Sequence, residues 1–200
     1  MKSKITLLLL FVLIGLKHIA QPVSSTTYVQ TCYNKTQCSS INNSSFLFFD
    51  ESRNELFLKV DFNNFKTGED SIDDWLNDLT ETALYFKAPF QAENFSGLSN
   101  HNHKNYTLRG EVFFNGIWHY QTIELTIFAA ESNMLGPNNN GNKYDNYKVN
   151  FSLPIAPKDF KIHKKPHHLT KTIFIGLALG RINLLLPGQE TILGDAYKKH

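Results

Sequence analysis

The sequence predicts an all-β fold with one short helix. Several segments alternate apolar and polar side chains with a period of two, which places the apolar ones on one face of a β-strand. Asn115-Gly116 lies between two such segments, and both residues tolerate the positive φ angles of a tight hairpin turn. One segment, after Asp70, instead has its apolar residues at helical spacing. We therefore expect antiparallel strands joined by turns.

Residues 1–20 have the layout of a secretory signal peptide. Lys2 and Lys4 precede an apolar run from Leu7 to Ile14, and the small residue Ala20 follows a polar pair. The apolar run is too short for a membrane-spanning helix, which needs roughly 20 residues. We expect cleavage after Ala20 and a periplasmic or secreted mature protein.

Residues 21–45 are rich in Ser, Thr, Asn and Gln, a composition that predicts an irregular polar arm. Cys32 and Cys38 lie in this arm, close together in the sequence, and in an oxidising compartment they are expected to form a local disulfide. Such a short loop gives only modest stabilisation. A metal site or a redox-active pair is the alternative, although this cysteine spacing is unusual for either.

The first predicted hairpin joins a short strand at Phe46–Phe49 to a strand at Glu55–Phe62. Thr67-Gly68 then breaks the alternation, and Asp70 is placed to cap a helix. The apolar residues of that helix recur at helical spacing: Ile72, Trp75, Leu76 and Leu79. Its acidic residues suit the start of a helix better than a calcium loop, so capping and solvation explain them: Glu69, Asp70, Asp73, Asp74 and Asp78.

The middle of the chain predicts a second hairpin. A strand over Ala83–Phe86 ends by Pro89, and Gln91–Asn105 reads as a polar loop. Alternating residues then indicate strands over Tyr106–Phe114 and Ile123–Ile127, paired through the Asn115-Gly116 turn.

The last third predicts two further strands. Ala130–Asp145 is rich in turn residues, and alternation resumes from Tyr147 to Leu153 until Pro154 and Pro157 interrupt it. Thr172–Leu186 is the most apolar run after the signal and predicts a long strand. Two glycines in this run are suited to a bend at a barrel corner, Gly176 and Gly180. The tail after Pro187, residues 187–200, carries little information.

The order of these elements resembles the YceI-like family. Three motifs carry the resemblance: the strand that leads through Thr67-Gly68 into an acidic helix with Trp75-Leu76, the hairpin at Asn115-Gly116, and the late segment Lys158–Ile162. The resemblance assigns residues 46–186 to an antiparallel, lipocalin-like β-barrel. It also implies an exported protein that binds a polyisoprenoid or another long-chain amphiphile.

The chain departs from the family pattern in two places. Family members usually open with two recognisable strands, and here only a weak candidate occurs around Thr27–Tyr33. We therefore expect a barrel that is shortened at its N-terminus and open along one side. Lys161 also stands where the family has a glycine.

The alternating strands give a candidate ligand site. The interior of a small barrel is either filled by side chains or large enough for one ligand. The sequence leaves both open, so the same residues are candidates for a cavity wall or for an ordinary core. They are Leu58, Val60, Phe62, Phe86, Leu108, Val112, Phe114, Ile123, Leu125, Phe151, Ile175 and Leu177.

The sequence contains no recognisable catalytic motif, so we expect a non-catalytic protein without cofactor or metal. His101 and His103, with His167-His168, are weak metal-site candidates, and a metal-dependent enzyme is the less favoured alternative. The basic stretch from Lys158 to Lys171 indicates a solvated connection or a transient membrane-surface contact.

The sequence also bears on the partners that this protein can have. The net charge is only +2, and the basic residues do not predict nucleic-acid binding. A ligand-free structural module on the same fold remains an alternative to a lipid carrier. The oligomeric state is left open, with a dimer among the options.

Overall fold

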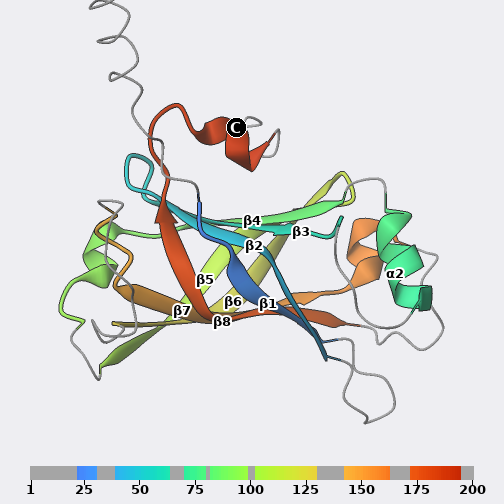
Figure 1. The fold of residues 1–200 in the computed structure, drawn as a ribbon, viewed down its shortest axis with the longest axis horizontal. Helices are drawn as coiled ribbons and strands as arrows, with labels where there is room; N and C mark the ends of the chain where they lie inside the picture. Colours follow the sequence, from blue (N-terminus) through green and yellow to red (C-terminus); the bar gives the residue numbers. More distant parts are fainter. Residues whose placement is uncertain are drawn as a thin grey trace, which may run out of the picture.

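The structure is a computed structural model, and it describes residues 22–30, 39–63, 70–79, 82–98, 102–129, 142–162 and 172–194. Within these ranges eight strands follow one another around a closed barrel, each antiparallel to the next (Figure 1). They are β1 Ser25–Gln30, β2 Ser39–Asp50, β3 Glu55–Asp61, β4 Ala83–Pro89, β5 His103–Phe114, β6 Ile117–Ala129, β7 Tyr147–Ile155 and β8 Ile173–Leu184. The predicted antiparallel, lipocalin-like barrel is confirmed.

The short helices lie around the barrel. They are α2 Asp70–Asn77 and the 3₁₀ turns η1 Ala92–Phe95, η3 Pro157–Phe160 and η4 Glu190–Leu193. Figure 1 places α2 at one end of the barrel, which we call the α2 end, where β3 and β7 also finish. β4 finishes and leads into η1 at the opposite end, the η1 end. No helix in the described ranges is long and apolar enough to cross a membrane.

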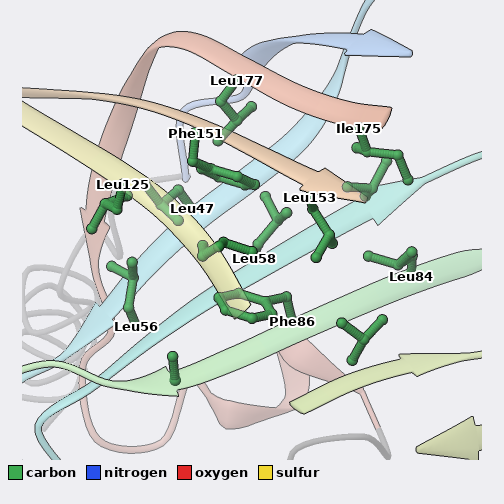
Figure 2. Packing of buried hydrophobic residues seen from close by; sticks show 14 of the residues in the cluster. Leu47, Leu56, Leu58, Leu84, Phe86, Leu125, Phe151, Leu153, Ile175 and Leu177 are labelled. Carbon is green, nitrogen blue, oxygen red and sulfur yellow. The ribbon is translucent and has the colours of Figure 1, made fainter. Parts of the chain in front are cut away.

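The apolar faces of the strands meet inside the barrel. Leu47, Leu58, Phe86 and Val112 are cross-strand neighbours on β2 to β5, and all four are almost completely buried. Figure 2 shows Leu47, Leu58 and Phe86 pointing into the same space. The period of two in the sequence therefore reports the inward face of the barrel, as the alternation of side chains along a strand requires.

Both predicted hairpins are confirmed. Asn115 and Gly116 have φ angles of 48° and 76° between β5 and β6, as a tight primed turn requires. In the turn from β2 to β3, one carboxylate oxygen of Asp50 accepts hydrogen bonds from the backbone N–H groups of Ser52 and Arg53, at 2.9 and 3.1 Å. Each turn thus fixes the register of the strands that it joins.

The N-terminal segment differs from the sequence prediction. In place of an irregular arm over 21–45, the structure has β1, and β2 extends back to Ser39. β1 pairs with β2 and also with β8, where Thr27 faces Leu177. Backbone ladders on both sides hold this polar segment, and the buried hydroxyls of Thr27 and Ser45 hydrogen-bond to each other. The expectation of a shortened, open barrel was therefore wrong.

Two polar stretches also contain more structure than predicted. The stretch Gln91–Asn105, expected to be a loop, contains η1, and β5 begins within it at His103. In the C-terminal tail, Leu193 of η4 is buried against Phe48 and Phe57 on the outside of the barrel. Single large apolar residues anchor these stretches, and they form no periodic pattern that the sequence alone would reveal.

The prolines of β7 and the glycines of β8 act differently from what the sequence predicts. β7 continues through Pro154 to Ile155, and Pro157 then begins η3, where its missing N–H costs nothing. In β8 the positive φ belongs to Leu179 rather than to a glycine. Gly180 instead permits close approach of β7, because a Cβ atom there would lie 3.3 Å from the carbonyl oxygen of Val149.

The signal peptide at residues 1–20 lies outside the described residues, as do both cysteines of the expected disulfide, Cys32 and Cys38. The same holds for Thr67-Gly68 and for most of the basic stretch, since only Lys158–Ile162 of it is described. Their roles remain predictions.

Lys161 occupies a backbone conformation that favours glycine. It follows η3 with a φ of 53° and ψ of 28°, in the left-handed region, and it is exposed. In that region the Cβ atom of an L-residue crowds the following carbonyl oxygen, at a cost of about 1–2 kcal/mol. A glycine at this position would adopt the same conformation without that steric cost.

Lys148 is a buried cation on the outer face of β7. It lies in register with Phe128 of β6 and Arg181 of β8, and its exposed fraction is only 9%. Desolvation by burial, reinforced by the positive charge of Arg181, lowers the pKa of Lys148 to about 8, while Asp145 acts in the opposite direction. The charged form of this lysine therefore opposes folding.

We predict that Lys161→Gly raises the free energy of unfolding by about 1 kcal/mol, because glycine adopts the left-handed conformation without steric cost. Urea unfolding followed by circular dichroism measures the change. Lys158→Gly, at an exposed position within η3, is the matched control and should lower stability by up to about 1 kcal/mol. Equal destabilisation by both substitutions would contradict the assignment.

We predict that Lys148→Met stabilises the protein at pH 7 and that this advantage shrinks as the pH rises. The folded pKa of about 8 lies below the ordinary value of 10.5. The penalty is therefore complete below pH 8 and fades as the pH rises from 8 toward 10.5. Urea unfolding at several pH values checks this, with the exposed Lys158→Met as control. An advantage that does not change over this window would contradict the titration of Lys148.

Candidate ligand site

All predicted wall residues lie in one buried cluster inside the barrel, with exposed fractions from 0% to 9%. They come from β3 to β8, apart from Phe62, which directly follows β3. Figure 2 shows six of them pointing toward a common centre: Leu58, Phe86, Leu125, Phe151, Ile175 and Leu177. The structure thus brings the predicted residues together. Their role as ligand contacts remains a prediction.

Further inward-facing residues were not among the predicted wall residues. They continue the same alternation, and their side chains join the same cluster: Leu47, Phe49, Leu56, Leu84, Ala88, Ile127, Val149, Leu153, Ile155, Ile173 and Ile182. Most were identifiable from the period of two alone. The interior surface is therefore larger and more uniformly apolar than predicted.

Polar groups inside the described part of the barrel are few. Thr27 and Ser45 are fully buried, and their hydroxyl groups satisfy each other, so they present little unpaired polarity to the interior. The indole of Trp75 is different, since its buried Nε1–H has no hydrogen-bond partner. The described part of the interior is therefore almost entirely apolar.

The η1 end is closed by packed aromatic rings. Phe95 of η1 lies 5.2 Å from both Phe49 and Phe90 between ring centroids, 4.8 Å from Tyr144 and 5.1 Å from Tyr147. All four pairs are tilted or edge-to-face, and aromatic quadrupoles favour such arrangements over face-to-face stacking.

Hydrogen bonds tie the rim of this aromatic cluster to the surrounding turns. The hydroxyl of Tyr106, whose ring lies 5.3 Å from Phe90, donates to the backbone oxygen of Asn94 at 2.7 Å. The hydroxyl of Tyr144 donates to Glu51, which also pairs with Lys143. The Lys143 hydrogen bond, with smaller help from its charge and from Tyr144, lowers the pKa of Glu51. The η1 end is therefore a sealed end.

Within the described ranges, the α2 end is covered by α2 and by η3, which follows β7. Trp75 and Leu76 of α2 belong to the interior cluster, as do Phe62 and Phe160. Phe114 connects the last two, with its ring 5.7 Å from each. A helix of eight residues is too short to be stable alone, so its position depends on the packing of these few side chains.

The described histidines do not form a metal site. His103 is exposed at the start of β5, on the outer face, and no group of three metal-ligating side chains occurs within the described ranges. His101, His163 and His167-His168 lie outside the described residues. The acidic residues of α2 are mostly exposed, as expected, except Asp73, which is buried.

Comparison with known proteins gives matches in structure only. A scan of family models and a search of curated proteins found no match. Among solved structures, a polyisoprenoid binding domain from Saccharophagus degradans implicated in plant cell wall breakdown is similar at a TM-score of 0.58 and 10% identity, over 78% of this chain and 92% of that one. BcnA from Burkholderia cenocepacia is similar at 0.50 and 13% identity, over 76% and 93%.

A YCEI protein of Campylobacter jejuni also matches, at a TM-score of 0.42 and 14% identity, over 82% of this chain and 88% of that one. Identities this low establish a common fold and nothing finer. The fold is therefore the one that the YceI-like resemblance predicted. It is a barrel similar to the polyisoprenoid binding domain and to BcnA.

Proposed function

We propose that this chain binds one long-chain apolar or amphiphilic molecule, an isoprenoid or a lipid, inside its barrel without changing it chemically. The observation that carries the proposal is the convergence of apolar faces from β2 to β8 on one closed interior. A protein with the same fold, the domain from Saccharophagus degradans, is a polyisoprenoid binding domain, which supports the ligand class.

The two ends of the barrel differ in a way that gives the ligand a route. Aromatic rings pack against one another at the η1 end, and the hydroxyls of Tyr106 and Tyr144 are hydrogen-bonded there. Opening this end would break several of these contacts together. Within the described residues, the α2 end is covered by α2, which packs through Trp75 and Leu76, and by η3, which packs through Phe160. We infer that a ligand enters at the α2 end, by displacement of the short helix α2.

The second candidate function is a ligand-free structural or interaction module. The near-complete burial of the inward-facing residues favours it, since side chains alone can fill a small barrel. A metal-dependent enzyme has no such support in the described residues. Export to the periplasm or outside the cell, and a transient membrane contact through Lys158–Lys171, belong to the proposal as the setting in which a carrier would load and unload.

The direct test is native mass spectrometry of the protein purified gently from its exported compartment, combined with extraction of bound lipid. A carrier should retain about one long-chain molecule per chain or take one up from added polyisoprenoid. A protein that is empty as purified and that takes up no added isoprenoid or fatty-acyl lipid would rule out the proposed function.

We predict that Val112→Phe abolishes uptake while the protein stays folded, because Val112 points inward beside Phe86 and the added ring would occupy space used by the ligand. In a solidly packed module the same change would overpack the core and cost about 1–3 kcal/mol of stability. Thr122→Phe, at an exposed position on the outer face of β6, is the matched control and should leave uptake unchanged. Uptake measured by native mass spectrometry and urea unfolding together separate the two functions.

A further inference from the structure

Trp75 carries a hydrogen-bond donor that the protein does not satisfy. The side chain is 8% exposed, and its Nε1 atom is buried without any partner, alone among the buried side-chain nitrogens and oxygens of the described ranges. Buried tryptophan N–H groups usually find an acceptor, and leaving one unpaired costs free energy. The buried N–H of Trp75 is therefore available to an acceptor that the described residues do not supply.

The position of Trp75 relates this donor to the barrel interior. Trp75 lies in α2, which covers the α2 end, and its side chain belongs to the same buried cluster as the inward faces of the strands. Figure 1 shows α2 beside the ends of the strands at that end of the barrel. A ligand chain that fills the barrel from the α2 end would therefore bring its terminal group close to this helix.

The chemistry of the indole restricts that terminal group. The indole N–H donates and cannot accept, so the group must contain an acceptor oxygen. A charged carboxylate or phosphate is disfavoured, because one donor in apolar surroundings does not compensate for desolvating a full charge. Asp74, next to Trp75 in the sequence, adds a further negative charge at this end of the barrel. An uncharged carbonyl, ether or hydroxyl oxygen fits these conditions.

We propose, resting on the proposed ligand-binding function, that the Nε1–H of Trp75 donates a hydrogen bond to an uncharged acceptor oxygen at the head of the bound ligand. The ligand thus lies with its hydrocarbon chain inside the barrel and its head under α2. The amphiphiles preferred are neutral ones, such as prenyl alcohols, ethers or quinones, over fatty acids and prenyl phosphates.

The test compares two probes with the same isoprenoid chain, geranylgeranyl methyl ether and the corresponding hydrocarbon without oxygen. Both are titrated into the full chain and into Trp75→Phe by displacement of a fluorescent lipid. Trp75→Phe should weaken binding of the ether roughly three- to tenfold, as the loss of one hydrogen bond predicts, and should weaken binding of the hydrocarbon much less. Trp118→Phe is the matched control, since Trp118 packs on Phe113 and beneath Lys87 outside the barrel.

The possible outcomes separate this inference from the function on which it rests. If the unaltered protein binds neither probe, the ligand-binding function is wrong and the inference falls with it. If it binds both and Trp75→Phe weakens both equally, Trp75 only packs against the ligand, and the inference alone is overturned. Binding of geranylgeranic acid as tight as that of the ether would overturn the preference for an uncharged head.

A second measurement does not depend on the folding of Trp75→Phe. Trp118→Phe leaves Trp75 as the one tryptophan of the chain, since the sequence has two. A new hydrogen bond from the indole should shift the emission maximum of Trp75 when the ether binds, whereas the hydrocarbon should leave it near its unliganded position. Identical spectra with the two bound probes would contradict the hydrogen bond.

Discussion

A single buried carboxamide joins the strands where the barrel closes. The Nδ2 group of Asn183 donates to the backbone oxygens of Val23 and Leu47, at 2.9 and 3.1 Å, and its Oδ1 accepts from the N–H of Val23 at 2.8 Å. The side chain lies where β1, which covers the first part of β8, gives way to β2, which pairs in parallel with the last part. Its hydrogen bonds join the segment before β1 to β2 and β8, and a buried backbone group without a partner costs about 1–3 kcal/mol.

Closure of the hydrogen-bonded ladder determines which side chains the strands can contain. A closed barrel has no exposed strand edge, so its backbone hydrogen bonds are made whatever the side chains are. This explains how the polar segments of β1 and β2 remain regular, with Thr27 and Ser45 paired inside. It also explains why the inward positions from β3 to β8 are almost entirely apolar, since they share one interior that the closure isolates from water.

The sequence predicts the parts of this structure that depend on local patterns. Alternation from Leu56 to Phe62 and the Asn115-Gly116 turn each specify a strand face or a register by themselves, and both predictions are confirmed. β1 depends instead on pairing Thr27 with Leu177, a contact between distant parts of the chain whose polar residues form no apolar pattern. The seal at the η1 end depends in the same way on Phe95, one ring in a polar stretch. The wall of the candidate site was thus predictable from the sequence. The closure of the barrel by β1 and the packing of Phe95 at the η1 end were not.

The asymmetry of the two ends links stability to the proposed binding. At the η1 end every ring gains from its neighbours, so that end contributes to the folded state whether or not a ligand is present. At the α2 end the buried side chain of Trp75 carries a donor without an acceptor, which reduces the stabilisation that its apolar packing provides. A ligand that supplies the acceptor removes this penalty only when it is bound. In the proposed binding mode, the ligand therefore satisfies the one buried side-chain donor that has no partner in the described residues.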